Sequence, residues 1–400
     1  MARTQLFSPL QLRGVTLKNR IVAAPMWQYA GVGGRPNDWH LMNLGRLADG
    51  GAGLVFQEGT TVERRGCGTL GDIGLWNDDS VEFYRRIVRL VKSCGAIAGI
   101  QLIHAGRKAR QLPPAQGRGA LQPGSEIPDW DAWDVIGPSA IPCGRGMPVP
   151  REMTAKDIVD VTAAFAAAAR RARQAGYEVL ELHAAHGYLL HTFLSPLSNR
   201  RTDAWGGSLE NRTRFVRDVA AAVRAEWPQD KPLLVRLSCI DGPDDGWSLQ
   251  DTIALVRQLK PLGVDCIDCS SGGIAGSPLT AGNAATYGYQ VDLASAVRQA
   301  TAMPTAAVGL IVHPRQAEQI LQRGQADLVM LARELIYNPN WPMDAAQKLQ
   351  DDKGFQVMQH REAFWLERRA LTVPGLVPST FGNESTEDAN RSAGLNIQLG

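Results

Sequence analysis

The sequence predicts a single (β/α)8 barrel, or TIM barrel, that carries an N-terminal hairpin and a long insertion after its third strand. Eight short apolar runs rich in β-branched residues recur along the chain, with helical patterns between them. The runs are almost continuously apolar, as expected of parallel strands that are buried on both faces. Strict alternation of strands and helices then favours a closed, right-handed parallel barrel.

The expected strands and helices follow one another along the whole chain. Thr154 with Asp157, and Ser248 with Asp251, have the spacing of capping boxes at helix starts. A doubly wound sheet is the alternative fold, but no GxGxxG motif follows an early strand. Strands are expected at 20–26, 53–58, 97–104, 177–183, 232–238, 264–270, 304–309 and 326–333. Further helices are expected at 79–93, 209–226, 290–300, 314–323 and 341–349.

Three segments fall outside this alternation. We expect residues 6–17 to form a hairpin that turns at Arg13-Gly14 and plugs the bottom of the barrel. Residues 106–153 follow the third strand at the end where barrel active sites form, so we expect an ordered substrate cover. The tail from 371 lacks periodicity and is expected to be partly disordered. The domain prediction is a barrel domain at 1–370 and a tail at 371–400.

Composition and charge exclude several classes of partner. The 42 basic and 40 acidic side chains are interspersed and leave a net charge of +2, so neither nucleic acid nor an anionic membrane is an expected partner. The N-terminal segment has no apolar signal region, and no stretch approaches the ~18 apolar residues of a spanning helix. We therefore expect a cytoplasmic protein that acts on a small molecule.

The six cysteines are too sparse for a disulfide framework, so reduced thiols are expected. Cys266 and Cys269 form a CxxC motif. Within a strand, however, residues three apart point to opposite faces, which argues against a metal or redox role. No metal site is predicted.

Polar side chains mark the ends of several expected strands, where a barrel places its chemistry: Gln101, His104, His183, Arg236, Ser270 and Arg333. The loops after strands seven and eight form the usual phosphate site of this fold, and here they supply Gly309 and Arg333. Glycine lets backbone N–H groups approach a ligand, and arginine neutralises its charge. A phosphorylated ligand is therefore expected.

The segment HAAHGYLLH (183–191) follows the fourth strand and has three interpretations. His183, His186 and Tyr188 could bind zinc, although zinc needs a further ligand and there is no HExxH motif. They could also be ordinary core residues whose polar atoms have hydrogen-bond partners. The third interpretation is a pair of donors that hold a substrate oxygen while the phenol supplies a proton.

Six segments together form a long and specific pattern: LKNRIVAAPM (17–26), QLIHAGRKA (101–109), ELHAAHGYLLHTFLSPLSNRRTDAWGGSLENR (181–212), VRLS (235–238), AVGLI (307–311) and LARELIYNPNW (331–341). With this pattern, residues 1–368 resemble the bacterial branch of the old yellow enzyme family of FMN-dependent ene-reductases, which includes the xenobiotic reductases. The resemblance implies an FMN that lies across the barrel mouth.

The resemblance assigns each side of that FMN to named residues. Pro25 and Met26 would contact the rear face of the flavin. Arg236 would lie at the pyrimidine edge and stabilise the negative charge of the reduced ring. The other implied cofactor contacts are Gln101 at the same edge, Gly309 and Arg333 at the phosphate, and also Ala24, Trp27, Gly59 and Ala332.

The resemblance also implies a hydride donor, NADPH or NADH, that stacks on the same flavin face and leaves before the substrate enters. His183 and His186 would hold the carbonyl or nitro oxygen of an electron-poor alkene while hydride adds from flavin N5. Tyr188 would then protonate the α-carbon. Tyr29 and Lys108 are expected beside the substrate.

Two features depart from the family pattern. The residue after Pro25-Met26, usually a cysteine in this branch, is Trp27, so the side chain that normally tunes the flavin near its C4 carbonyl is absent. The chain also continues beyond FWLERR (364–369), where a C-terminal arginine of related enzymes reaches a neighbouring subunit's site. Arg368 matches it best and Trp365 would line the partner's pocket in a homodimer or larger homo-oligomer. An ordinary surface helix end is the alternative.

Three functions are compatible with this pattern. The leading one is reduction of α,β-unsaturated ketones, aldehydes, imides or nitro compounds. A second uses the flavin for isomerisation or desaturation, because Trp27 changes the position that tunes it. A third is non-catalytic flavin binding, against which the intact His183, His186 and Tyr188 argue.

Overall fold

A closed barrel of eight parallel strands forms the centre of the molecule. The computed structural model describes residues 4–124, 127–274 and 286–373. In barrel order the strands are β3 (Ile21–Ala23), β4 (Leu54–Thr61), β5 (Ile97–Ile103), β8 (Val179–Ala184), β9 (Leu233–Ser238), β10 (Cys266–Ser270), β11 (Thr305–Ala307) and β12 (Leu328–Leu331). The predicted barrel is confirmed, and each strand overlaps its expected position.

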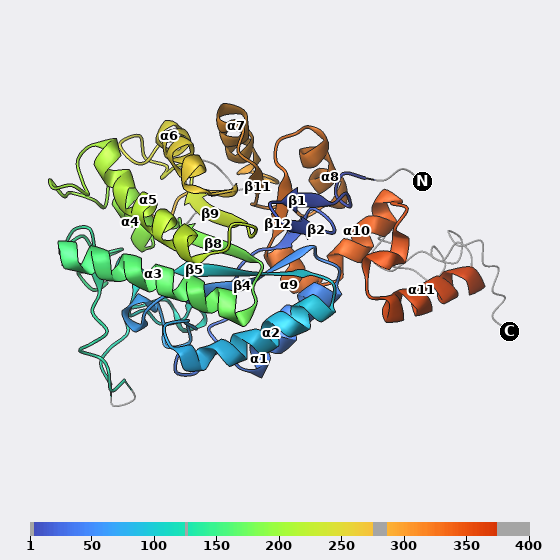
Figure 1. Cartoon of the computed structure of the whole chain (residues 1–400), viewed down its shortest axis with the longest axis horizontal. Helices are drawn as coiled ribbons and strands as arrows, with labels where there is room; N and C mark the ends of the chain where they lie inside the picture. Colours follow the sequence, from blue (N-terminus) through green and yellow to red (C-terminus); the bar gives the residue numbers. More distant parts are fainter. Residues whose placement is uncertain (1–3, 125–126, 275–285, 374–400) are drawn as a thin grey trace.

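Helices cover the outside of the barrel, as Figure 1 shows. The predicted ones are α2 (Val81–Ser93), α3 (Ala155–Ala175), α5 (Leu209–Glu226), α6 (Leu249–Leu259), α7 (Val291–Thr301), α8 (Pro314–Gln322) and α10 (Trp341–Leu349). Both predicted capping boxes are present, at Thr154 with Asp157 and at Ser248 with Asp251.

Four helices are absent from the sequence prediction: α1 (Asp38–Asp49), α4 (Leu189–Leu194), α9 (Arg333–Tyr337) and α11 (His360–Thr372). Helix α1 begins after a glycine-rich segment and is capped in an unusual way. The side chain of His40 accepts from the backbone N–H of Asn37, at 3.0 Å, where glutamate or glutamine is the common choice. This helix start therefore lacks the sequence signal of a common capping box.

The N-terminal hairpin closes the bottom of the barrel, as predicted. Strands β1 (Leu10–Leu12) and β2 (Val15–Leu17) pair antiparallel around Arg13 and Gly14. Arg13 has a φ of 50° and bonds to Asp265, just before β10, which places the turn at the amino ends of the barrel strands. Leu12, Val15 and Leu17 are buried with the inward-facing side chains of the barrel.

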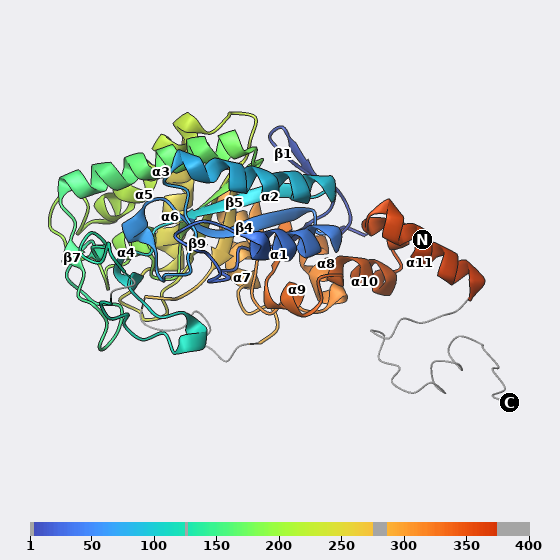
Figure 2. The same cartoon turned by 90° about the horizontal axis from the view of Figure 1, so that it is seen from below.

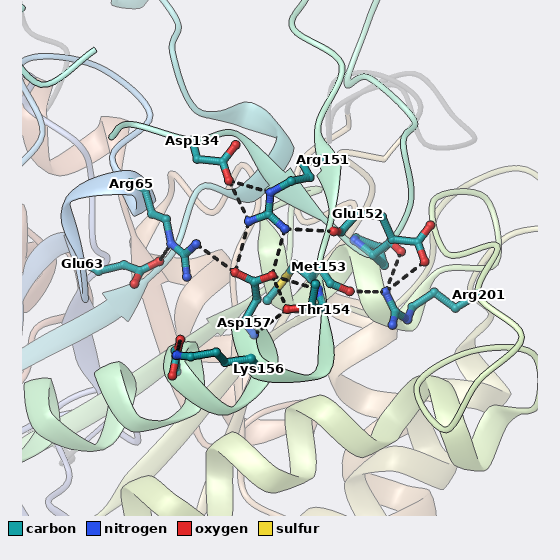
Figure 3. A network of polar contacts seen from close by, with 12 residues as sticks. Glu63, Arg65, Asp134, Arg151, Glu152, Met153, Thr154, Lys156, Asp157 and Arg201 are labelled. Atoms are coloured by element: carbon teal, nitrogen blue, oxygen red, sulfur yellow. Dashed lines mark hydrogen bonds and ion pairs between the residues drawn. The ribbon is translucent and has the colours of Figure 1, made fainter. Parts of the chain in front are cut away.

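The insertion at 106–153 is an ordered part of the molecule over the residues that the structure describes. It contains the short strands β6 (Ile136–Gly137) and β7 (Arg151–Glu152) and ends in a network of ion pairs, shown in Figure 3. The Asp157 carboxylate in α3 accepts two hydrogen bonds from Arg151, at 2.9 and 3.1 Å, and one from Arg65 at 3.1 Å. Trp133 is fully buried, with the Arg64 guanidinium 3.9 Å from its ring centroid.

All six cysteines are free thiols. Cys266 packs inside the barrel and Cys269 in the outer core, on opposite faces of β10 as predicted. Among the described residues, no helix has the length and apolar character needed to cross a bilayer.

Candidate active site

A cavity of about 530 Å³ opens at the carboxyl ends of β9 to β12, within the size range of cofactor and small-molecule sites. Each of these strands contributes to its wall at or just after its last residues. Arg236 comes from β9, Ser270 from β10, Gly309 from the loop after β11, and Arg333 from the start of α9. His186, from the segment after β8, lines the cavity beside Ser270.

The loops after β11 and β12 shape one end of the cavity for an anionic group. Gly309 has a φ of +110°, and a Cβ there would lie 2.7 Å from the side-chain nitrogen of Gln290, so only glycine fits without strain. Ala332 and Arg333 lie at the junction of β12 and α9 and line the same space. Backbone N–H groups at a glycine, where no side chain blocks their approach, can bind a phosphate together with an arginine guanidinium.

Two neutral histidines lie at the end of β8. Burial lowers the pKa of His183 and His186 well below its usual value, and the charge of Arg236 lowers it further. His183 Nδ1 accepts from the Ala185 backbone N–H at 3.2 Å, so its proton is on Nε2, 3.3 Å from His186 Nδ1. His186 Nε2 then carries the second proton and lies 2.6 Å from Ser270 Oγ. Both rings thus present one N–H donor.

Tyr188 follows this pair and lies among aromatic rings. Its ring centroid is 5.0 Å from His183 and 5.1 Å from Trp27, both in T-shaped contacts. Burial raises the pKa of Tyr188 above its usual value, and the negative potential of Tyr29 and Asp72 acts in the same direction. The phenol is therefore neutral. Burial also raises the pKa of Tyr29 to about 12.

Trp27 turns into the barrel mouth and is held there. Its indole N–H donates to the Gly59 carbonyl at 2.6 Å, and its ring lies 6.0 Å from Tyr29. A Cβ on Gly59 would lie 2.8 Å from the indole nitrogen, so Gly59 makes room for the indole.

The segment before Trp27 follows β3 directly into the mouth. Ala24 donates its backbone N–H to Leu331 of β12 at 2.9 Å. Pro25 is half-buried, and the Gln28 side chain donates to the Met26 carbonyl at 2.8 Å. The backbone of Gln28 also donates to Glu58. These bonds fix the course of the chain at 24–28.

Lys108 lies at the start of the insertion and has no carboxylate partner in the described part of the chain. Its ammonium donates to the backbone carbonyls of His186, at 2.5 Å, and Gly273, at 2.9 Å. It also lies 5.2 Å from the Tyr188 ring centroid. Burial lowers the pKa of Lys108 to about 8. Lys108 thus fixes the backbone of the histidine segment.

Buried charged and polar groups lie beneath the mouth. The Gln101 amide donates to Glu181 at 2.8 Å, and Arg236 Nε lies 3.0 Å from Asp268. Gln101, Glu181 and Asp268 are almost inaccessible to solvent. His104, another polar strand end, donates to Glu63 at 2.8 Å and belongs to the network below the insertion rather than to the cavity.

The structure does not bring Trp365 and Arg368 to this mouth. Both lie on α11 and are exposed. Helix α11 lies at the end of the molecule opposite the insertion, as Figure 1 and Figure 2 both show. Further cavity residues are absent from the sequence prediction, among them the polar Arg118, Tyr289, Gln290 and Glu334. Arg118 comes from the insertion, and Tyr289 and Gln290 directly precede α7, where the sequence has no motif that marks a ligand contact.

Comparison with known proteins identifies the class of this site. Residues 5–352 match the model of the NADH:flavin oxidoreductase / NADH oxidase family. The chain belongs to this family. An NADPH dehydrogenase of Geobacillus thermodenitrificans is 45% identical over 349 residues, which are 86% of this chain and 95% of the relative. An NADPH dehydrogenase of Bacillus velezensis is 41% identical over 351 residues, 87% of this chain and 96% of the relative.

Solved structures of this family share the fold. The old yellow enzyme homologue from Zymomonas mobilis is 26% identical, with a TM-score of 0.71 over 86% of this chain and 93% of that one. Morphinone reductase in complex with tetrahydroNAD is 25% identical, also with a TM-score of 0.71, over 86% of this chain and 90% of that one. The chain is thus an NAD(P)H:flavin oxidoreductase of the old yellow enzyme type, with FMN as cofactor and a reduced nicotinamide as hydride donor. These predictions are confirmed.

The residues at the mouth fit FMN. The anionic end of the cofactor matches Arg333 and the bare backbone of Gly309. Arg236 lines the cavity and faces Asp268 through Nε at 3.0 Å, so its terminal guanidinium nitrogens are the donors that a ligand in the cavity would meet.

Proposed function

We propose that this oxidoreductase is an ene-reductase that reduces the carbon–carbon double bond of α,β-unsaturated carbonyl or nitro compounds. The observation that carries the proposal is the neutral pair His183 and His186 with the protonated phenol of Tyr188 beside it. Two N–H donors and one weak acid within one mouth are what polarisation and protonation of such an alkene need.

In this proposal the histidine pair binds the activating oxygen of the substrate. His183 Nε2 and His186 Nε2 now face His186 and Ser270, at 3.3 and 2.6 Å. A carbonyl or nitro oxygen would replace these internal acceptors. Since both rings are neutral, they donate hydrogen bonds without protonating the oxygen. They thereby draw electron density away from the β-carbon.

The bound FMN supplies the hydride, which it receives from NADPH or NADH. Gly309, Ala332 and Arg333 would hold its phosphate end, and Gln101 and Arg236 its pyrimidine edge. Ala24, Pro25 and Met26 would lie against its rear face, with Trp27 and Gly59 at its side. Tyr188 would give its phenolic proton to the α-carbon and regain one from solvent. The donor and the substrate would use the same face in turn, in ping-pong order.

Trp27, Tyr29 and Lys108 shape the substrate side of the mouth in this proposal. The indole of Trp27 lies against Tyr188 and its N–H is already bonded to Gly59. It therefore acts as a wall and narrows the space beside the phenol. Lys108 holds the His186 backbone from the other side.

We further propose a cytoplasmic homodimer or larger homo-oligomer with a barrel domain at 1–370. The free cysteines are consistent with a reducing compartment. Trp365 is 71% exposed on α11, where Phe364 and Leu371 are exposed as well, and such a group of apolar side chains supports an interaction surface. Arg368 follows Trp365 one turn later. Both would complete a neighbouring subunit's site. Most of the predicted tail at 371–400 lies outside the described residues.

Anaerobic turnover tests the proposal. Purified holoenzyme is mixed with NADPH and cyclohexenone, and both NADPH and cyclohexanone are measured. The expected result is one saturated ketone formed for each NADPH consumed. Isomerised product without net NADPH consumption would favour the isomerase, and a flavin that NADPH cannot reduce would favour a binding protein. Oligomeric size is measured separately by light scattering, where a monomer would contradict the homodimer.

A further inference from the structure

Two carboxyl groups and one guanidinium are enclosed in the barrel directly beneath the cofactor site. Glu181 comes from β8, Arg236 from β9 and Asp268 from β10. Strands β8 and β10 alternate around the barrel, and side chains from alternate strands share a layer of a barrel interior. Glu181 and Asp268 are both 0% exposed. The three groups therefore form one buried charge cluster.

The bonding of this cluster is incomplete. Glu181 Oε1 accepts from Gln101 at 2.8 Å, and Asp268 Oδ2 lies 3.0 Å from Arg236 Nε. Within the described part of the chain, Glu181 Oε2 and both Asp268 oxygens lack a hydrogen-bond donor in good geometry. If both carboxyls were ionised, a single guanidinium would face two negative charges. An unpaired charge is strongly unfavourable in a buried site, so such a carboxyl keeps its proton instead.

We propose that Glu181 and Asp268 hold one proton between them, and that this proton sets how strongly Arg236 stabilises the reduced flavin. Asp268 is the ionised partner, because its oxygen faces Arg236. Glu181 carries the proton, because its nearest bonded neighbour is the neutral amide of Gln101. The inference rests on the proposed place of Arg236 at the flavin edge, and it makes Glu181 a positioning residue rather than a catalytic one.

Electrostatics favours the same assignment. Burial raises the pKa of Glu181 to about 8, and the charge of Asp268 acts in the same direction while Arg236 opposes it. Burial also raises the pKa of Asp268, but Arg236 opposes the shift. The other titratable groups that interact with the cluster lie on the same strands and at the cavity wall. Burial raises the pKa of the Cys266 and Cys269 thiols well above its usual value and also raises the pKa of Tyr289, whereas it lowers the pKa of His183 and His186. Each of these shifts favours the neutral form, so none of these groups adds a charge.

The functional consequence follows from charge. A flavin that accepts a hydride gains two electrons and one proton and is left with one negative charge, which Arg236 is placed to offset. Ionisation of Glu181 adds a second negative charge beside Arg236 and disfavours that reduced form. The midpoint potential should therefore fall more steeply with pH once Glu181 ionises. One proton coupled to two electrons adds at most ~30 mV per pH unit, a tenfold change in the equilibrium constant.

The decisive variant is Glu181→Gln, which has the shape of the protonated acid and cannot ionise. The midpoint potential of holoenzyme is measured from pH 6 to pH 10. We expect equal potentials for wild type and variant at pH 6 and a higher potential for the variant above about pH 8. Glu178→Gln is the matched control, because Glu178 precedes β8 at the other end of the barrel and pairs with Lys92 at 3.2 Å. Parallel curves for wild type and Glu181→Gln would overturn the proposal.

A second arm needs neither flavin nor a folded Glu181 variant. Infrared spectra of flavin-free wild type should show the C=O band of a buried protonated carboxyl at pH 7, and this band should disappear above about pH 8. In Asp268→Asn the band should already be absent at pH 7, since Glu181 then pairs with Arg236. Absence of this band in wild type would overturn the shared-proton proposal and would say nothing against the ene-reductase function. Wild-type enzyme that shows the band but does not reduce enones would count against the ene-reductase function instead.

Discussion

At the scale of single residues, the surroundings of Tyr188 decide what its phenol can do. Burial keeps the phenol protonated across the neutral range, and the T-shaped contacts with His183 and Trp27 hold the ring in one orientation. A weak acid kept neutral and fixed in place is suited to deliver a proton to carbon, not to bind a cation. Removal of the phenolic hydroxyl should therefore affect the enzyme's two half-reactions, flavin reduction and alkene reduction, differently.

Tyr188→Phe keeps the ring and removes only the acid. We expect alkene reduction to slow by about 10²-fold or more, the usual contribution of a positioned general acid. Reduction of the flavin by NADPH should keep its rate, because that step needs no acid at this position. Stopped-flow absorbance of each half-reaction measures the two rates. Equal slowing of both, or of neither, would show that Tyr188 only lines the pocket.

Trp27 is one of the two positions expected to depart from the family pattern, and its ring lies against Tyr188. Trp27→Cys should enlarge the mouth and place a polarizable sulfur near the flavin. Bulky β-substituted enones should then gain rate about tenfold relative to cyclohexenone, and the midpoint potential should shift. Trp27→Phe is the control that keeps aromatic bulk but loses the bond to Gly59. If Trp27→Cys changed the rates of bulky enones and cyclohexenone by the same factor and left the midpoint potential unchanged, Trp27 would have a structural role only.

At the scale of elements, the insertion is attached to the barrel through the start of α3. Asp157 is at once part of the capping box with Thr154 and the acceptor for Arg151 and Arg65 (Figure 3). Arg65 in turn pairs with Glu63, which accepts from His104 at the end of β5. One carboxylate thus joins the end of the insertion, the loop after β4 and the long helix α3.

Asp157→Asn tests this junction. The hydrogen bonds from Arg151 hold the pKa of Asp157 well below its usual range, so its stabilising effect is present above the unfolded-state pKa and is lost as pH falls through the folded one. We expect a loss of about 1.5–3 kcal/mol in the free energy of unfolding at pH 7. The difference from wild type should narrow below about pH 4.

Urea unfolding at a series of pH values measures this difference. Asp160→Asn is the control, since Asp160 lies one turn later on α3 and its ion pair, among the residues that the structure describes, is with the exposed Lys156. It should change stability by less than about 1 kcal/mol. A difference between Asp157→Asn and wild type that stays constant down to pH 3 would contradict the proposed pairing.

At the scale of the whole molecule, local and periodic signals were sufficient to predict the barrel but not its interior chemistry. The capping box of Thr154 and Asp157 spans four residues, so the sequence shows it directly. The bonds of His186 to Ser270 and of Arg236 to Asp268 join different strands. Their partners are fixed by barrel register, which no local pattern contains. Arg118 reaches the cavity from the irregular insertion for the same reason.

The cofactor should also stabilise the whole molecule, because its site is assembled from strands far apart in sequence. Only the folded chain brings Arg236, Gly309 and Arg333 to one cavity. Free FMN at 100 times its Kd should therefore stabilise the flavin-free protein by about 2.7 kcal/mol. This is seen as a rise of a few degrees in Tm, of the order of 1–3 °C for each kcal/mol in a chain of this size.

Riboflavin, which lacks the phosphate, separates the two ends of that site. It should raise Tm less than FMN at equal concentration, and Arg333→Gln should remove most of the difference, because the arginine then no longer offsets the phosphate charge. Arg323→Gln is the matched control, an exposed arginine at the end of α8 outside the cavity. Differential scanning fluorimetry measures all six combinations of the two ligands with wild type and the two variants. Equal shifts by FMN and riboflavin in wild type would show that Gly309 and Arg333 do not bind the phosphate.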